Sequence, residues 1–237
     1  MAIYKITYSE KFKRANLHNY GCNFNCEWCS YKLNSNGKPD KFLTIDRIKE
    51  VLSHLDLERV HFIGGEPTLY PGLAEITEFA HNQLGVYTKI GHSNGSCMPP
   101  PNIDAWSVSI RTVSDKIHQN YTGGKPASPV LQNFKDAYNK GIEMDASSIL
   151  IPDIFDQDEI EKVAKFISEI DPKIPYHIVG YVPVPNSPWR KPTCNEVKES
   201  VHIANKYLKH VTFSCLSIED YSNLHTRDIR YKSIRVA

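Results

Sequence analysis

Three cysteines near the start of the chain are the residues whose types and spacing point most directly to chemistry. Cys22, Cys26 and Cys29 form the pattern C-x3-C-x2-C after an apolar, strand-like segment. Because iron–sulfur clusters usually take four cysteines, three would leave one iron open to a small ligand, as a catalytic metal site requires. The alternative is a structural zinc site, which needs four ligands, with His18, Cys97 or a distant residue as the fourth.

A glycine-rich segment about one strand–helix unit later is the second candidate. Gly64, Gly65, Glu66 and Pro67 follow an apolar run over residues 60–63 and precede a helical pattern. Paired glycines let the backbone turn sharply and approach a ligand closely, and proline fixes the turn. We expect the carboxylate of Glu66 to project into the ligand space. Alone, such a segment would be an ordinary loop, but its position after the cysteine motif favours a binding site.

The two motifs resemble those of radical S-adenosylmethionine (SAM) enzymes. That family has C-x3-C-x2-C with an aromatic residue before the last cysteine, matched by Trp28, and Gly-Gly-Glu-Pro as its amino-group motif. The resemblance implies a 4Fe–4S cluster on Cys22, Cys26 and Cys29, whose open iron chelates the amino and carboxylate groups of the SAM methionine. It also implies reductive cleavage of SAM, with a flavodoxin or ferredoxin-type electron donor, to a 5′-deoxyadenosyl radical that abstracts hydrogen. The cofactor supplies this chemistry, and the protein supplies positioning and exclusion of water.

Two later segments resemble the activating enzymes of the pyruvate formate-lyase type. Residues 92–95, His-Ser-Asn-Gly, match a Thr-Asn-Gly-like element that lines the SAM site there, and residues 109–111, Ser-Ile-Arg, match an Asp-x-Lys strand end. Arginine in place of lysine keeps a cation, with better bidentate geometry toward a carboxylate. By this resemblance the SAM-binding residues are Gly64, Gly65 and Glu66 at the amino group, Ser93 and Asn94 at the ribose side, Ser109 with Arg111 at the strand end, where Arg111 meets the carboxylate, and Trp28 over the cluster or the adenine edge.

The chain also departs from that family at several positions. His92 stands in place of an acidic residue, Ser109 in place of the strand-end aspartate, and Val182 near the place of a histidine that follows the sixth strand. The usual His-Asn pair after the last cluster cysteine is Ser30-Tyr31 here. These changes leave SAM cleavage in place but weaken the case for one particular glycyl-radical substrate.

The leading interpretation is an anaerobic radical SAM oxidoreductase that draws hydrogen from a glycine in a partner glycyl-radical enzyme. Its docking surface would include Tyr181, Trp189 and Arg190, since aromatic residues and arginine are typical interface anchors. The alternative substrate is a small molecule or nucleoside precursor, as in compact carboxy-deazaguanine-type synthases. A non-catalytic zinc or iron–sulfur binding module is the alternative class. The sequence assigns no catalytic residue of the chain itself.

Length and composition predict one soluble catalytic domain over residues 1–237, expected to be a monomer. The chain has a net charge of +1, 41% hydrophobic and 23% charged residues, so bulk charge indicates no nucleic-acid partner. It lacks an apolar stretch of the ~18 residues that a membrane span needs, and residues 1–8 lack a signal-peptide core. Three thiolates on a cluster imply a reducing compartment, hence the cytoplasm. Cys97, Cys194 and Cys215 lack ligand spacing and are interpreted as buried or idle thiols.

Strand-like and helix-like segments alternate along the chain, which predicts parallel βα units. About six units are too few for a closed eightfold barrel of ~250 residues, so we expect a partial (β/α)6 barrel, the fold that the resemblance also implies. Ligands would then lie at the carboxyl ends of the strands. The basic run over residues 227–235 is interpreted as a solvated tail. The expected strands are 16–20, 60–63, 87–91, 105–110, 145–150, 176–181 and 210–213, and the expected helices are 44–53, 69–83, 130–139, 156–170 and 195–208.

Overall fold

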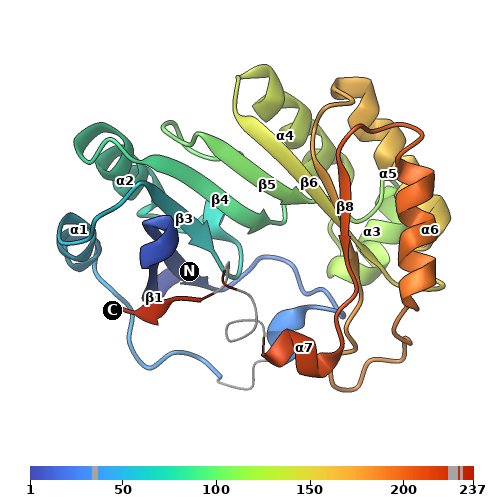
Figure 1. Cartoon of the computed structure of the whole chain (residues 1–237), viewed down its shortest axis with the longest axis horizontal. Coiled ribbons are helices and arrows are strands. Elements are labelled where there is room, and N and C mark those ends of the chain that lie inside the picture. Colours follow the sequence, from blue (N-terminus) through green and yellow to red (C-terminus); the bar gives the residue numbers. More distant parts are fainter. Residues whose placement is uncertain (34–36, 224–228, 230–231) are drawn as a thin grey trace.

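One curved, mostly parallel sheet organises the part of the chain that the structure describes (Figure 1). The computed structural model describes residues 1–33, 37–223, 229 and 232–237. Its strands lie in the order β8-β7-β6-β5-β4-β3-β2-β1-β9, and β2 to β8 run parallel. The parallel strands are β2 Arg14–Tyr20, β3 Arg59–Ile63, β4 Tyr87–Ser93, β5 Ala105–Ser109, β6 Glu143–Leu150, β7 Tyr176–Gly180 and β8 Val211–Ser214. At one edge, β1 (Ala2–Ser9) pairs antiparallel with β2, and β9 (Ile234–Arg235) pairs antiparallel with β1.

The outer face of the sheet carries the hydrophobic core. Leu17, Phe62, Ile90 and Trp106 are paired across four neighbouring strands, and each side chain is fully buried. Side chains alternate between the two faces of a strand, so this register sets one apolar face outward and leaves the other face concave and polar. Helices cover the outer face: α1 Ile45–Ser53, α2 Leu73–Glu78, α4 Ser128–Asn139, α5 Gln157–Ile170 and α6 Cys194–Ala204.

Local signals fix where these helices begin. The Thr44 side chain accepts a hydrogen bond from the Arg47 amide at the start of α1, and Asp156 accepts from two amides at the start of α5. Such side chains satisfy amides that have no partner within the helix. One face of the helix expected over 156–170 is apolar in the sequence: Ile160, Val163, Ala164 and Ile167 on this face are fully buried, and Ile170 is partly buried.

The structure confirms the partial barrel and adds elements that were not predicted. β1, α3 (Asp115–Thr122) and α7 (Ile218–Ser222) lie in segments for which no helix or strand was expected. The predicted helix over 69–83 is broken into a 3-10 turn (Pro67–Leu69), α2 and a π-helical turn (Phe79–Gln83). Ile234 and Arg235 of the run interpreted as a solvated tail are exposed, but they pair with β1 as the short strand β9. Residues 227, 228, 230 and 231 of that run lie outside the described residues.

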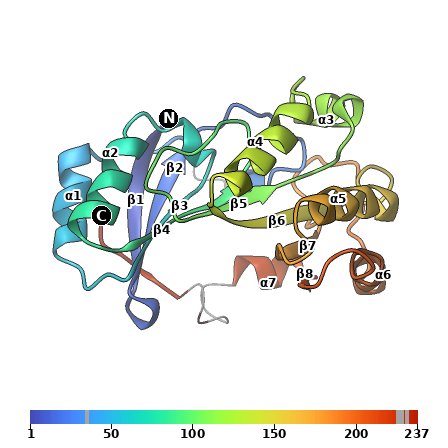
Figure 2. The same ribbon diagram turned by 90° about the horizontal axis from the view of Figure 1, so that it is seen from above.

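The sheet does not close into a ring, because β8 is its last strand at one end and β9 at the other. The chain leaves β8, forms α7 and reaches β9 at the opposite edge, so α7 lies between the two edges in both views (Figure 2). None of the described helices is long and apolar enough to cross a membrane.

Candidate active site at the carboxyl ends of the strands

The cysteine loop follows directly after β2. Cys22, Cys26 and Cys29 are all free thiols, with Cys22 exposed and the other two half-buried. The loop is held by its own backbone, since the Cys29 amide donates to the Cys26 carbonyl (3.2 Å), and by a neighbour, since the Asn25 amide donates to the Thr122 carbonyl at the end of α3 (3.0 Å). The loop that carries the three sulfurs is therefore held by one hydrogen bond within it and by one to the end of α3.

The glycine loop packs directly on the residue before the first cysteine. Gly64 and Gly65 both have positive φ, +84° and +50°. A Cβ on Gly65 would lie 2.1 Å from the Gly21 carbonyl oxygen, and one on Gly64 would lie 2.7 Å from that of Asn19. The Glu66 amide also donates to the Gly21 carbonyl (2.9 Å). Only glycine fits this backbone approach, so the two motifs form one structural unit.

The Glu66 carboxylate is the internal hub of that unit. It is fully buried, and it accepts hydrogen bonds from the Thr68 amide (3.1 Å), the Thr68 hydroxyl (2.7 Å) and the Ser93 hydroxyl (2.8 Å). Its second oxygen accepts from the Asn94 amide. Burial raises the pKa of Glu66, and these hydrogen bonds act in the opposite direction. The side chain that we expected to project into ligand space instead fixes the loop after β4.

Through that loop the hub reaches the first cysteine. The Asn94 side-chain amide donates to the Cys22 sulfur (3.5 Å) and to the Asn23 side-chain oxygen (2.8 Å). Asn23 in turn donates to the Ser96 hydroxyl (3.0 Å). The sequence analysis did not single out Asn23, Thr68 or Ser96. Each lies within or directly beside a motif, and that position is the one signal that could have identified them.

Arg111 is the cation that faces the cysteines. It follows β5, and it interacts electrostatically with all three thiols. Burial raises the pKa of the Cys26 thiol to about 11, and Arg111 acts against that shift. A nearby cation favours the thiolate, the form that binds metal. Ser109, two residues earlier, is buried and hydrogen-bonds to the Ser147 hydroxyl (3.1 Å).

Trp28 anchors the cysteine loop to the far side of the barrel. It is 3% exposed and belongs to a small apolar cluster with Ile151, Ile154, Phe155 and Tyr181. Its ring meets Phe155 edge to face, with 4.8 Å between centroids. Because Tyr181 is fully buried in this cluster, its predicted role as an exposed docking residue is wrong.

The concave face of the sheet below these loops is polar. Asp145 accepts hydrogen bonds from the Lys89 ammonium (2.7 Å) and the Ser107 hydroxyl (2.7 Å). The buried Nε2 atom of His61 has no hydrogen-bond partner. His92 has a φ of +59°, at a register break in β4, and interacts electrostatically with Asp145, Lys89 and Arg111. Strand bulges and residues in this left-handed region are common beside active sites.

The donor set fits an iron–sulfur cluster better than a zinc ion. Within the described residues, no group of three or more His, Cys, Asp or Glu side chains is placed to share one ion. A cubane spreads its thiolates over separate irons, whereas structural zinc gathers four ligands around one centre. Three free thiols on one loop, with Arg111 near all three, are compatible with a cluster that leaves one iron open.

Two of the cysteines outside the motif are not idle thiols. Cys194 and Cys215 form a disulfide with Cα atoms 5.7 Å apart, so that interpretation is wrong for them. Sequence spacing could not show this pairing, because Cys194 begins α6 and Cys215 follows β8, and only the fold brings these positions together. Cys97 remains a free, half-buried thiol.

Comparisons with known proteins identify the family of the chain. A family model, the radical SAM superfamily, matches residues 16–167. The chain is 31% identical over 223 residues to the "Putative glycyl-radical enzyme activating enzyme MJ1632" of Methanocaldococcus jannaschii, covering 90% of this chain and 84% of that protein. It also matches GTP 3′,8-cyclases, such as that of Actinobacillus succinogenes at 26% identity, over 47% of the relative's length.

Solved structures share the fold. A domain of pyruvate-formate lyase-activating enzyme from Bacteroides vulgatus superposes with a TM-score of 0.54 at 20% identity, covering 65% of this chain and 98% of that one. QueE from Escherichia coli superposes with a TM-score of 0.56 at 14% identity, covering 90% and 93%. The chain belongs to the radical SAM superfamily, enzymes that combine an iron–sulfur cluster with SAM.

Proposed function

We propose that this chain is a glycyl-radical enzyme activating enzyme with one catalytic domain over residues 1–237. Cys22, Cys26 and Cys29 would hold a 4Fe–4S cluster, which with bound SAM supplies the 5′-deoxyadenosyl radical. The observation that carries the proposal is the continuous contact from Cys22 through Asn94 to Glu66. This contact supports the proposal because it joins the cysteine loop to the glycine loop through the loop after β4.

The chain's own residues would bind and orient SAM in this unit. The backbone of Gly64 and Gly65 gives close approach to the methionyl amino group, and Glu66 holds Ser93 and Asn94 in place toward the ribose. Arg111 would pair with the methionine carboxylate, as arginine does in bidentate geometry. Trp28 and its apolar neighbours would exclude water from one side of the cluster, which strengthens electrostatic contacts inside the site.

A protein glycine as the hydrogen donor is supported by the name of the relative from M. jannaschii. The unclosed sheet gives a protein loop a route toward the concave face, since β8 and β9 are separate edges. A flavodoxin or ferredoxin-type protein would supply the electron.

A small polar substrate is the second candidate, favoured by the concave face itself. The Lys89–Asp145 ion pair, with the Ser107 hydroxyl on the same carboxylate, places charged and hydrogen-bonding groups on this face. Binding sites of this kind fix polar ligands with a few such groups.

Isotope transfer separates the two substrate classes. The chain is reconstituted anaerobically with iron and sulfide, reduced, and given SAM with a candidate glycyl-radical enzyme that carries α-deuterated glycine. Deuterium in 5′-deoxyadenosine, together with a glycyl radical in the electron paramagnetic resonance spectrum, would support the activase. Deuterium-free 5′-deoxyadenosine with every candidate protein, but labelled product from a deuterated metabolite extract, would overturn it in favour of the small molecule.

A further inference from the structure

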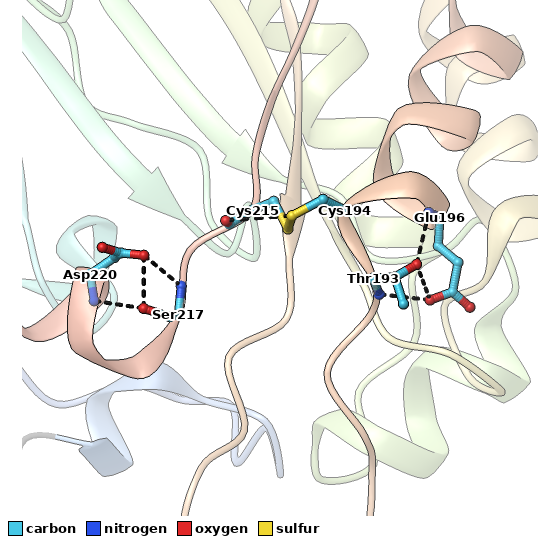
Figure 3. Close-up of a disulfide and its surroundings, with 6 residues drawn as sticks. All are labelled: Thr193, Cys194, Glu196, Cys215, Ser217 and Asp220. Atoms are coloured by element: carbon cyan, nitrogen blue, oxygen red, sulfur yellow. Dashed lines mark hydrogen bonds between the residues drawn. A yellow bond between two sulfur atoms is a disulfide. The ribbon is translucent and has the colours of Figure 1, made fainter.

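The Cys194–Cys215 disulfide joins two elements at the edge of the sheet where it stays open. Cys194 is the first residue of α6, directly after the N-cap Thr193. Cys215 is the first residue after β8 (Figure 3). Cys215 also lies against the end of β7, since a Cβ on Gly180 would be 3.6 Å from its Cα atom. The bond therefore fastens the chain to the rim at the point where it leaves the sheet.

The segment that starts at this bond crosses the open side of the barrel. After Cys215 come residues 216–223, which include α7, and the chain then reaches β9 on the other edge. β9 is held by pairing of Thr7 with Arg235 and of Tyr8 with Ile234. The Ala237 carbonyl also accepts from the Ile6 amide (2.9 Å). Described anchors thus stand at both edges, a disulfide at one and a short ladder at the other.

α7 carries local capping contacts within this segment. Ser217 and Asp220 form a reciprocal capping box, with hydrogen bonds of 2.7 to 3.2 Å between them (Figure 3). Ser222 and Asn223 donate back to carbonyls of the same helix. Because these contacts are local and the helix has only 5 residues, α7 is marginal by itself and depends on its anchors to stay ordered.

The segment also lies close to the turn that follows the cysteine loop. Tyr221 of α7 lies within electrostatic range of Tyr31, in the 3-10 turn Ser30–Leu33 that follows Cys29. The Tyr31 hydroxyl would be 3.0 Å from a Cβ on Gly64. α7 therefore lies near the turn that follows the cysteine loop.

The two sulfurs differ in ways that suit exchange chemistry. Cys194 is exposed and Cys215 is half-buried, so an incoming thiolate reaches Cys194 first. Cys194 also lies at a helix N-terminus, where backbone amides favour a thiolate. Three of the four other cysteines form the candidate cluster motif, which implies reducing conditions, and under such conditions a disulfide is typically transient and redox-sensing.

We propose that Cys194–Cys215 is a thiol–disulfide exchange site for a dithiol reductant, and that its reduction frees residues 216–223 from the rim of the barrel. The first thiolate of the reductant attacks the Cys194 sulfur, forms a mixed disulfide and expels the Cys215 thiolate. The second thiol of the reductant then displaces the Cys194 thiolate and closes its own disulfide. Two electrons and two protons pass from the dithiol to the cysteine pair, and no other reactant is needed. The inference goes beyond the proposed function and holds for either substrate class.

Hydrogen–deuterium exchange of the full chain tests this without substrate or SAM. Dithiothreitol without denaturant should reduce the bond within minutes, raising the alkylatable cysteines from four to six after quenching and unfolding. Exchange in peptides covering 216–223 should then rise at least fivefold, with α6 and β8 unchanged. The Cys215→Ser variant should show the fast exchange before any reductant is added.

Two controls make the result decisive. Cys97→Ser removes a free cysteine and should keep the full response to dithiothreitol, whereas the Cys194→Ser/Cys215→Ser double variant should show none. A bond that resists dithiothreitol until the chain is unfolded would overturn the proposal. So would unchanged exchange over 216–223 after reduction, or an equal rise throughout α6 and β8, which would mark an ordinary structural disulfide. These outcomes leave the proposed hydrogen abstraction untouched, since its isotope test reports on it separately.

Discussion

The loops at the β2–β5 end of the sheet and the segment at the β8 edge are held in opposite ways. Around Glu66, short hydrogen bonds from Thr68, Ser93 and Asn94 lock neighbouring loops to the first cysteine. At the β8 edge, one disulfide fastens the departing chain. A network of many hydrogen bonds holds the loops in one arrangement, because the bonds support one another. A segment held by one disulfide can be released by one reaction. The contrast is therefore between a proposed SAM site held by many contacts, the rigid region, and a border held by one covalent bond, the proposed adjustable border.

The largest effect should come from the cysteines of the rigid region. Replacing Cys22, Cys26 or Cys29 by Ala should remove most iron and lower SAM cleavage at least about a hundredfold, since even outer-shell changes at metal sites cost 10–100-fold. Iron analysis after anaerobic reconstitution and 5′-deoxyadenosine yield measure both. Cys97→Ala should keep about four irons per chain, the content of one cubane. Loss of iron in that variant would mean that the three-cysteine assignment is wrong.

Gly65→Ala should come next. The new Cβ would meet the Gly21 carbonyl at 2.1 Å, so the glycine and cysteine loops must separate, and we expect a loss of at least about 3 kcal/mol in unfolding free energy. Gly85→Ala is the matched control, because Gly85 has a similar φ of +65° but open space around its Cβ position. It should lose only about 1–2 kcal/mol, the cost of a left-handed residue. Equal losses in urea unfolding would show that the close approach contributes nothing.

Glu66→Gln should weaken SAM binding without releasing iron. The amide keeps the shape of the side chain but removes the charge that accepts from Ser93 and Asn94, contacts of roughly 1.5–3 kcal/mol. SAM affinity, measured by equilibrium dialysis, should fall about tenfold to a hundredfold, and Glu66→Ala should fall at least as far. Unchanged affinity in both variants would separate the Glu66 hub from SAM binding.

The stability of the protein should depend on pH through His61, a half-buried histidine on the concave face. Burial, with Arg14 and Lys89 nearby, lowers the pKa of His61 to about 3. The unfolded chain binds this proton near pH 6.5, so stability falls as pH drops from 6.5 toward 3. Between pH 7 and 5 the loss from His61 should be about 1–2 kcal/mol.

His61→Asn should flatten that pH dependence, and His202→Asn, at an exposed position of α6, should not. Chemical unfolding at pH 7 and pH 5 gives both slopes. An identical slope in wild type and His61→Asn would mean that His61 is as well solvated folded as unfolded.

The smallest effect should come from the adjustable border. Cys215→Ser should leave iron content and SAM cleavage without substrate within about twofold of wild type, because neither cysteine of the pair belongs to the rigid region. A tenfold loss of this cleavage would mean that the disulfide also supports the SAM site, and the contrast between the two regions would be wrong.

The sequence by itself determined the chemistry of this protein. Cys22, Cys26 and Cys29, and Gly64 to Pro67, are fixed by local requirements, since ligand spacing and positive φ belong to a few consecutive residues. The α5 stripe and the Thr44 and Asp156 caps could be predicted for the same reason.

Tertiary structure alone decided what lies between those motifs. Glu66 became a buried hub because β3 and β4 end side by side, which brings Glu66 to Ser93, 27 residues later in the chain. Tyr181 is buried because it packs in the apolar cluster that contains Trp28. β9, near the C-terminus, pairs with β1 near the N-terminus. Cys194 and Cys215 meet because α6 packs beside β8. Each of these contacts joins residues far apart in sequence, and no local spacing encodes which distant strand end will be the neighbour.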